Sequence, residues 1–266
     1  DFENFSNTSI LLKGARSFKF EKISHKLEKK IHQTIFEINI NSIVSNLNYF
    51  KTYLNESTKI VVMVKAFSYG SGSYEIANIL QHHRIDYLAT AFYDEGIELR
   101  KAGIKLPIMV MNPGIAGYND MCEYSLEPVI YNFRLLRELI SIAEKNNLNV
   151  ALPVHIKLDT GMTRLGFDFE EIEDLSEILS HTSCIKVKTV FSHLAGADSS
   201  EFDEFTIEQI SLFEKMTKIL SKNIKYKFWR HILNSAGIER FPDFQFDMVR
   251  LGIGLYGISA VNHKIE

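Results

Sequence analysis

Cysteine and proline are scarce in this sequence of 266 residues, which has 2 Cys and 5 Pro. Cys122 and Cys184 lie in no CxxC or Cys/His pattern, so a disulfide framework and a zinc site are both disfavoured and we expect reduced thiols. No apolar run approaches the ~18 residues of a membrane span, and the segment DFENFSNTS lacks the features of a signal peptide. The net charge of −3 leaves no basic footprint for nucleic acid. We expect a cytoplasmic protein that has no metal site, enters no membrane and binds no nucleic acid.

Short apolar runs alternate with helical patterns from residue 58 onward. Successive apolar residues within a run are typical of parallel strands that are buried on both faces. The runs cover residues 59–65, 86–92, 106–112, 126–131, 151–159, 185–193, 226–233 and 244–252. Helical spacing of apolar residues appears between them, at 133–145, 168–180 and 201–220. This alternation predicts an α/β fold, a (β/α)8 TIM barrel, although a doubly wound sheet alternates in the same way.

The first 57 residues do not belong to this alternation. Residues 31–40 alternate between apolar and polar side chains like a half-exposed strand. Residues 41–54 read as an amphipathic helix that begins at a cap formed by Asn41 or Ser42.

Polar residues gather after the predicted strands. A barrel of this kind carries its active site at the carboxyl ends of its strands, and more polar residues converge there than a purely structural barrel needs. They are Lys65, Tyr69, Lys157, Asp159, Arg164, His193, His231, Asn234, Ser235 and Arg250, with the glycine-rich segments at 234–237 and 250–254.

Lys65 is the first candidate for chemistry. It follows the apolar run VVMV, so its amine is expected to be partly desolvated, which favours it as a nucleophile. The alternative interpretation is a lysine whose amine simply reaches water at the strand end. His193 and His231 have no metal-ligand spacing, and either could also be a hydrogen-bonded histidine without chemistry.

The loops after the last two strands are candidates for a phosphate site. Ser235 offers a hydroxyl, and Gly252 and Ile253 offer backbone N–H groups that glycine allows an anion to approach. Each glycine alone could equally be a turn residue. A reactive lysine that faces a phosphate site suggests pyridoxal 5′-phosphate as the cofactor.

Five sequence blocks together resemble the bacterial alanine racemases. They are KAFSYGSG, HIKLDTGMTRLGF, FSHLAGAD, HILNSAG and DMVRLGIGLYG, in the order that the family has them. The resemblance covers about residues 34–260 and implies the pyridoxal-phosphate barrel known as fold type III. Phe67, Ser68 and Ser71 depart from the usual lysine motif, but Lys65 and Tyr69 are retained.

The resemblance implies a role for each matching residue. Lys65 should bind the cofactor covalently and act as a catalytic base, and the phosphate should be held by Tyr69, Ser235, Gly252 and Ile253, with Asn234 as a further cofactor-binding residue. The remaining catalytic residues implied are Arg164, which also places the substrate, His193 against the pyridine ring and Arg250 at the ring nitrogen, with His231 supporting Arg250. Lys157 matches a lysine that is often carbamylated in the family.

The implied activity is an isomerase reaction, the interconversion of L-alanine and D-alanine. The family takes its second base, a tyrosine, from the C-terminal β domain of the other subunit of a head-to-tail homodimer. We expect residues 34–257 to form the barrel, residues 258–266 to begin that β domain, and this stretch alone to be catalytically incomplete. A racemase for serine or another small amino acid, and a non-catalytic pyridoxal-phosphate carrier barrel, are the alternatives.

Residues 1–33 carry a separate resemblance. SILLKGARSFKFEKI is similar to the end of the Mur ligases, where Lys13, Gly14, Arg16 and Glu21 match. The resemblance implies a fusion of the ligase that adds D-alanyl-D-alanine to alanine racemase, and therefore a role in peptidoglycan synthesis. No Walker-type phosphate loop is present in these 266 residues.

Overall fold

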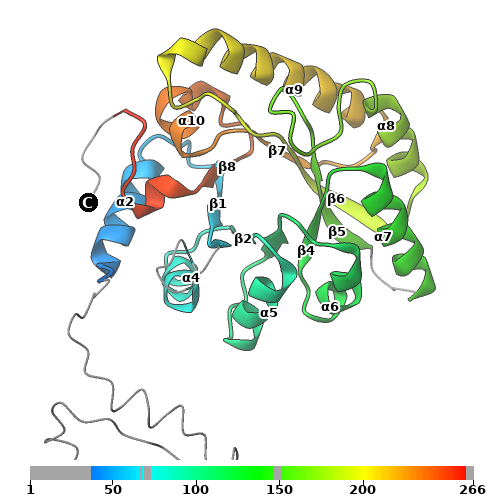
Figure 1. The fold of residues 1–266 in the computed structure, drawn as a ribbon, viewed down its shortest axis with the longest axis horizontal. Helices are drawn as coiled ribbons and strands as arrows, with labels where there is room; N and C mark the ends of the chain where they lie inside the picture. The colour runs from blue at the N-terminus through cyan, green and yellow to red at the C-terminus, as the bar shows by residue number, and fades with distance from the viewer. Residues whose placement is uncertain (1–36, 66–67, 69–72, 147–150, 262–266) are drawn as a thin grey trace, which may run out of the picture. The chain divides into compact units, whose positions relative to one another are not determined.

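Eight parallel strands form the centre of the structure, as the alternation of apolar runs predicts (Figure 1). The computed structural model describes residues 37–65, 68, 73–146 and 151–261. All eight predicted strands are confirmed within these residues, each shorter than its apolar run. They are β1 (Lys59–Met63), β2 (Tyr87–Thr90), β3 (Ile108–Val110), β4 (Glu127–Ile130), β5 (Leu152–Lys157), β6 (Ile185–Phe191), β7 (Trp229–His231) and β8 (Met248–Leu251).

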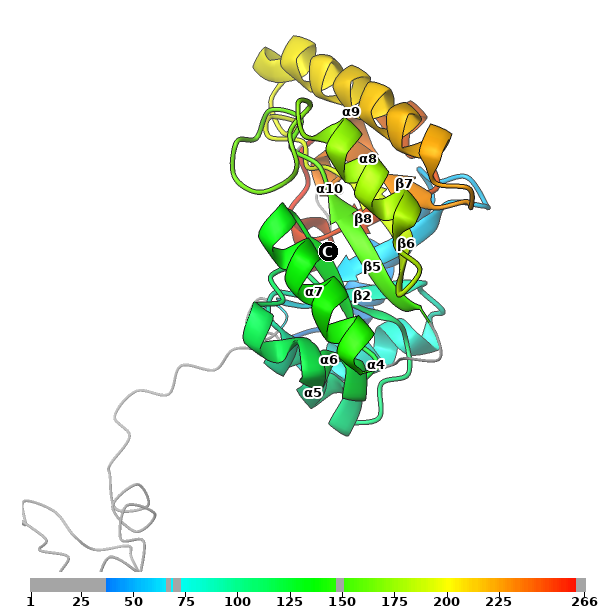
Figure 2. The same cartoon turned by 90° about the vertical axis from the view of Figure 1, so that its right-hand side faces the viewer.

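Helices surround these strands and cover their outer face (Figures 1 and 2). The predicted helix at 133–145 is observed with the same bounds, and those at 168–180 and 201–220 are observed with shifted ends. The helices are α2 (Ile40–Lys51), α4 (Ser73–His82), α5 (Tyr93–Lys101), α6 (Tyr118–Glu123), α7 (Phe133–Lys145), α8 (Ile172–His181), α9 (Asp203–Asn223) and α10 (Ser235–Arg240). Short 3-10 helices are η2 (Ile115–Gly117), η3 (Ser200–Phe202), η4 (Pro242–Phe244) and η5 (Ile253–Tyr256).

The strand order β7-β6-β5-β4-β3-β2-β1-β8 wraps the sheet into a nearly closed barrel. β1 pairs with both β2 and β8, so the ladder is continuous there. At the remaining seam, individual hydrogen bonds join the segments of β7 and β8: Asp247 N–H, just before β8, donates to the Arg230 carbonyl of β7 at 3.1 Å, and Arg250 N–H of β8 donates to the Leu233 carbonyl, just after β7, at 3.0 Å. The barrel is therefore held shut at this seam by a few bonds and not by a full ladder.

The interior of the barrel combines an apolar cluster with polar side chains. Alternate residues of each strand point inward, and the apolar ones that pack together are Val61, Met63, Tyr87, Ala89, Met109, Val129, Phe191 and Met248. His155, Thr189 and His231 are fully buried in the same interior. Buried polar groups of this kind require hydrogen-bond partners.

The segment before the barrel differs from its prediction. Of the strand expected at 31–40, residues 31–36 lie outside the described residues, residues 37–39 form no strand, and α2 begins at Ile40. The cap is Asn39 and not Asn41 or Ser42, because the Asn39 side chain accepts the N–H groups of both of those residues, at 3.0 and 3.3 Å. An asparagine that takes up the first free N–H groups of a helix moves the helix start toward itself.

The two cysteines are free and half-buried, as the sequence predicts. Among the described residues, no helix has the length and apolar character that crossing a bilayer requires. No group of three or more potential metal-ligating side chains occurs in the described part of the chain.

Helix α2 packs against η5, the turn that follows β8. Asn46 donates from its side chain to the Leu255 carbonyl at 3.0 Å, and the buried ring of Phe50 lies against Gly254. A Cβ atom at residue 254 would overlap that ring and would also lie 3.1 Å from the Ser235 Cβ. The glycine is therefore required by the close approach of three segments.

We predict that Gly254→Ala lowers the free energy of unfolding by about 1–3 kcal/mol, because the added methyl forces the Phe50 ring or the turn to move. Chemical denaturation of the full-length protein measures this loss. The same substitution in a Phe50→Leu background should cost less, since the smaller side chain leaves room. Equal costs in both backgrounds would contradict the proposed overlap.

Candidate active site

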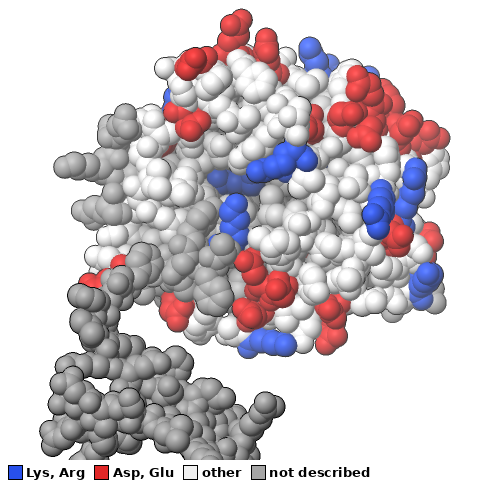
Figure 3. Space-filling view, in the orientation of Figure 1, with Lys and Arg blue, Asp and Glu red and all other residues white. Residues whose placement is uncertain are grey.

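A cavity of about 530 Å³ opens at the carboxyl ends of the barrel strands. Its lining brings together residues from most of the strand ends that the sequence singled out. Lys65, Lys157, Arg164, His193, Asn234, Ser235, Arg250, Gly252 and Ile253 all line it, with Met63, Met111, Asn112, Met162, Leu165 and Phe191 among the others. Figure 3 shows lysine and arginine side chains gathered in a hollow near the centre of this face.

The lining of the cavity is strongly cationic. It includes Lys65, Lys157, Arg164 and Arg250, and among the described residues Asp198 is the one acidic side chain of the lining. Like charges held this close together in a partly desolvated space repel one another. The cavity is consequently suited to a ligand that carries several negative charges, such as a phosphate or a carboxylate.

Arg250 is the most buried of these cations. It is 3% exposed, and burial lowers its pKa to about 9, which still leaves it charged at neutral pH. One terminal nitrogen donates to His231 Nδ1 at 2.7 Å, and the other donates to the carbonyls of Ser192 and Ile232 at 2.5 and 3.0 Å. Among the described residues, the hydrogen bonds of Arg250 leave from its two terminal nitrogens. The Nε–H is thus the donor left for a group in the cavity.

Aromatic packing holds the guanidinium from the other side. The Phe191 ring stacks on the His231 ring with centroids 4.8 Å apart, and the guanidinium lies 4.9 Å from the Phe191 centroid. Burial lowers the pKa of His231 well below its usual range, and the charge of Arg250 acts in the same direction. His231 is therefore a neutral acceptor for Arg250.

Lys157 lies at the end of β5 and is 6% exposed. Burial and the charges of Arg164 and Arg250 lower its pKa to about 8, although the charge of Asp159 opposes this shift. A substantial fraction of this amine is accordingly uncharged just above neutral pH.

His193 is positioned by a glutamine of helix α9. Gln209 donates to the His193 carbonyl at 3.1 Å and accepts the Ala195 N–H at 2.9 Å, so it holds the segment after β6 at two points. Burial, together with the positive charges of Arg250, Arg164, Lys157 and Lys65, lowers the pKa of His193 to about 3. Gln209 is therefore a polar residue on the buried face of α9, and it positions the segment that carries His193.

A tight loop after β5 carries Arg164 into the cavity. Asp159 accepts the N–H groups of Gly161 and Thr163 at 2.9 and 3.1 Å, which closes a turn within the loop. The Phe167 N–H then donates to the Lys157 carbonyl at 3.0 Å. The sequence Asp-Thr-Gly at 159–161 therefore forms a turn in this loop.

The two loops predicted to bind phosphate lie side by side. Ser235 Oγ accepts the N–H of Gly252 at 3.0 Å and that of Gly254 at 3.1 Å. A hydroxyl that accepts two N–H groups still has its own hydrogen to donate to an anion. Asn234 caps α10 by accepting the Gly237 N–H at 2.8 Å, so it shapes this loop.

Most of the predicted site residues meet in one cavity, with three exceptions. Tyr69 lies outside the described residues, and Asp159 faces its own turn. His231 does not line the cavity but lies buried against Arg250 in the barrel interior. Three residues that the sequence patterns did not single out extend the polar contacts of His231 through the barrel: Glu127, His155 and Thr189. Each is a polar residue inside a predicted buried strand, and that position was the available signal.

The chain is similar to alanine racemases in sequence and in structure. Residues 38–260 match the family described as alanine racemase, N-terminal domain. Alanine racemase 1 of Oceanobacillus iheyensis is 34% identical over 234 residues, which are 86% of this chain and 61% of that protein. The solved structure of Clostridium difficile alanine racemase in complex with cycloserine is 34% identical with a TM-score of 0.78, and the match covers 83% of this chain and 60% of that one.

A more distant structure shares the fold alone. The alanine racemase of Bartonella henselae, solved with covalently bound pyridoxal phosphate, is 24% identical with a TM-score of 0.76, and the match covers 85% of this chain and 61% of that one. The chain spans about 60% of the length of these relatives.

We predict that His193 stays neutral between pH 5 and 9 in the cofactor-free full-length protein, because its pKa is lowered to about 3. The unfolded chain binds a proton at this histidine near pH 6.5. Unfolding therefore takes up a proton below that pH, and the free energy of unfolding falls as the pH decreases from about 6.5 toward 3. Histidine NMR titration measures the protonation of His193, and denaturation at pH 5 and 7 measures the change in the free energy of unfolding. His193→Gln should reduce the pH dependence; an NMR midpoint above pH 5 would contradict the assignment.

Proposed function

Since this chain belongs to the alanine racemase family and matches its N-terminal domain, we propose that the protein containing it is a pyridoxal-phosphate-dependent isomerase that interconverts L-alanine and D-alanine. The observation that carries this proposal is the single cationic cavity that Lys65, Arg164, His193, Ser235 and Arg250 line together. The substrate is a small amino acid, and its carboxylate matches the charge of the cavity.

The chemistry of the lining fits pyridoxal phosphate. Lys65 supplies the amine that holds it, and Ser235 and Ile253, together with Tyr69, supply donors for its phosphate. The predicted donor Gly252 N–H is instead directed to Ser235 Oγ, so Gly252 contributes by holding that hydroxyl in place. His193, as a neutral ring, fits against the pyridine, Arg250 fits the ring nitrogen through Nε–H, and Arg164 fits the phenolic oxygen and the substrate carboxylate. When bound, the cofactor stabilises negative charge at the Cα atom of the amino acid.

The residues of this chain then account for one half of a two-base reaction. Released by the incoming amino acid, the Lys65 amine takes the Cα proton from one face of the substrate or returns it to that face. Arg250 only donates hydrogen bonds, so it leaves the ring nitrogen unprotonated, which limits negative charge on the ring and suppresses side reactions. The opposite face requires a second base, which we assign to a tyrosine of a C-terminal β domain from the other subunit of a head-to-tail homodimer.

Lys157 is proposed to be carbamylated. A lysine reacts with CO2 only as the free amine, forming the N–C bond of a carbamate and releasing one proton. The lowering of its pKa to about 8 supplies free amine near neutral pH, and Arg164 and Arg250 lie close enough to act on its charge. The carbamate would place a negative charge among these cations and orient Arg164.

The proposal extends to the use of the product, D-alanine, in the cell. D-Alanine made by a cytoplasmic enzyme would supply peptidoglycan synthesis. The Mur-ligase-like segment SILLKGARSFKFEKI supports a fusion of the two activities. Purified full-length protein that lacks ligation of D-alanyl-D-alanine to the muramoyl tripeptide would count against the fusion and leave the racemase proposal intact.

Two alternatives remain distinguishable by experiment. A racemase for serine would turn over serine faster than alanine in the same assay. A carrier barrel would bind pyridoxal phosphate at Lys65 and show no racemisation of either amino acid. The family match over residues 38–260 favours alanine over both.

We predict that Lys65→Ala abolishes covalent cofactor binding and lowers racemisation by at least about 100-fold, because the variant lacks both the anchoring amine and the base. Borohydride reduction of the full-length holoenzyme followed by peptide mapping locates the labelled lysine. Lys105→Ala, which removes an exposed surface lysine, should retain both properties. Labelling at another lysine would refute the assignment.

Arg250→Glu should change the course of the reaction more than cofactor binding. A carboxylate at this position favours a protonated ring nitrogen, which strengthens the cofactor as an electron sink. We expect racemisation to fall by about tenfold or more, or ~1.4 kcal/mol of barrier for each factor of ten, while transamination increases relative to it. Pyruvate and D-alanine formed from L-alanine give the ratio. Arg250→Lys retains a donor and should show no such increase; equal ratios in both variants would place Arg250 away from the ring nitrogen.

A further inference from the structure

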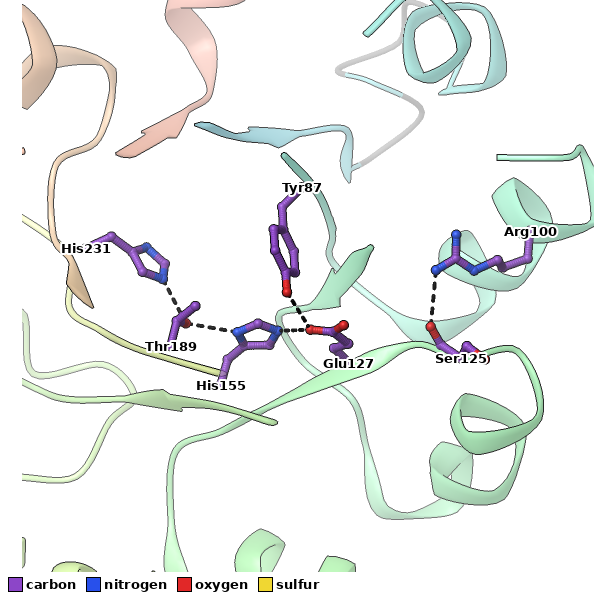
Figure 4. Close-up of polar contacts among 7 residues, drawn as sticks. All are labelled: Tyr87, Arg100, Ser125, Glu127, His155, Thr189 and His231. Atoms are coloured by element: carbon purple, nitrogen blue, oxygen red, sulfur yellow. Dashed lines mark hydrogen bonds and ion pairs between the residues drawn. The ribbon is translucent and has the colours of Figure 1, made fainter. Parts of the chain in front are cut away.

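A continuous chain of hydrogen bonds leads from Arg250 across the interior of the barrel. The Arg250 guanidinium contacts His231 Nδ1 at 2.7 Å, and His231 Nε2 lies 2.9 Å from Thr189 Oγ1. The same hydroxyl lies 2.9 Å from His155 Nδ1, and His155 Nε2 lies 2.9 Å from Glu127 Oε2. Figure 4 shows the chain from His231 to Glu127, where it meets the hydroxyl of Tyr87.

The members of this chain come from five strands. Arg250, His231, Thr189, His155 and Glu127 belong in turn to β8, β7, β6, β5 and β4. His231, Thr189 and His155 have no exposed surface, and the Glu127 side chain is 12% exposed. Water therefore has little access along the chain, and its members depend on one another for hydrogen bonds.

When both histidine rings are neutral, the two ends of the chain determine where every proton lies. A guanidinium has donors only, so His231 Nδ1 must accept, and the neutral ring must carry its proton on Nε2. That proton is donated to Thr189 Oγ1, which leaves the threonine hydrogen to be donated to His155 Nδ1. His155 then carries its own proton on Nε2 and donates it to the Glu127 carboxylate.

The carboxylate end is stable as an acceptor. Burial acts to raise the pKa of Glu127, but the hydrogen bonds that it accepts from His155 and Tyr87 outweigh burial and hold the pKa below its usual range. The Tyr87 hydroxyl donates to Glu127 Oε2 at 3.1 Å, and its pKa is raised by burial and by this carboxylate. Every donor in the chain thus points from Arg250 toward Glu127.

The opposite arrangement of protons would disturb Arg250. If His231 carried its proton on Nδ1, that N–H would face the guanidinium N–H at 2.7 Å, and the guanidinium would have to turn away. The Nη donors now directed to the Ser192 and Ile232 carbonyls would move with it. The orientation of the guanidinium, and with it of Nε–H, therefore depends on which nitrogen of His231, on the neighbouring strand β7, carries the proton.

We propose that Thr189, His155 and Glu127 are positioning residues for Arg250, which hold His231 as its Nε2–H tautomer and so direct the Arg250 guanidinium toward the cavity. The catalytic consequence rests on the proposed function, in which Arg250 faces the ring nitrogen of pyridoxal phosphate. The tautomer itself depends only on the residues of this chain.

The test uses Thr189→Val with Thr189→Ser as its matched control in the full-length protein. Valine retains the shape of threonine and removes the hydroxyl, whereas serine retains the hydroxyl. Selective 15N-histidine labelling distinguishes the two tautomers by NMR without any cofactor. We expect His231 and His155 to be Nε2–H tautomers in the parent protein and in Thr189→Ser, and the His231 pattern to change in Thr189→Val.

Activity is the second readout. Thr189→Val should lower kcat for racemisation by about tenfold, equivalent to ~1.4 kcal/mol of barrier, with KM and the amount of bound pyridoxal phosphate within about twofold of the parent. Its transamination relative to racemisation should increase, which a merely structural defect would not produce. Thr189→Ser should restore both values.

A second pair of variants tests the same proposal at another residue, in case Thr189→Val does not fold. Glu127→Leu removes the terminal acceptor, and Glu127→Gln retains one oxygen that can accept from His155. We expect the leucine variant to follow Thr189→Val and the glutamine variant to retain the parent tautomers. A parent protein with His231 as the Nδ1–H tautomer, or unchanged kcat and tautomers in both Thr189→Val and Glu127→Leu, would overturn the proposal. A parent protein that keeps the tautomers but binds no pyridoxal phosphate would overturn the proposed function alone.

Discussion

A buried guanidinium without a directly bonded carboxylate is the constraint on which much of this structure depends. Arg250 satisfies its terminal nitrogens with the carbonyls of Ser192 and Ile232 and with a neutral histidine. Those acceptors lie at the ends of β6 and β7, while Arg250 itself lies on β8. The side chain therefore joins the two strands whose ladder is incomplete, and closure of the barrel and assembly of the site depend on the same contacts.

The concentration of positive charge at the strand ends explains the protonation of the rest of the site. Burial and the neighbouring cations both act against further protonation, so His193 is neutral and Lys157 loses its proton readily. The cations of the site repel one another, and an anionic ligand would stabilise the site by neutralising part of this charge. The balancing carboxylate, Glu127, lies at the far end of the hydrogen-bonded chain from Arg250, where it does not compete with a ligand in the cavity.

The sequence predicts the eight strands and the cationic site because each depends on local pattern or on known motif spacing. Apolar runs are long enough to reveal buried parallel strands, and Lys65, Arg164 and Arg250 stand in motifs of a known family. The sequence does not predict contacts that depend on which residues of different strands lie next to each other in the barrel. The chain through Thr189, His155 and Glu127 exists because three polar residues of β6, β5 and β4 meet inside the barrel. The start of α2 was misjudged because strand-like alternation extends through Asn39, which acts as a cap.

The loop that carries Arg164 limits how this site can diverge. Gly161, Thr163 and Gly166 have positive φ angles of 127°, 54° and 137°, and a Cβ at Gly166 would overlap the backbone of Asp159. Backbone geometry therefore dictates the residues at these positions. Met162 and Leu165 line the cavity from the same loop and have no positive φ. Evolution of substrate preference on this side of the pocket is thereby confined to two side chains, and an insertion or deletion in the loop would displace the arginine along with them.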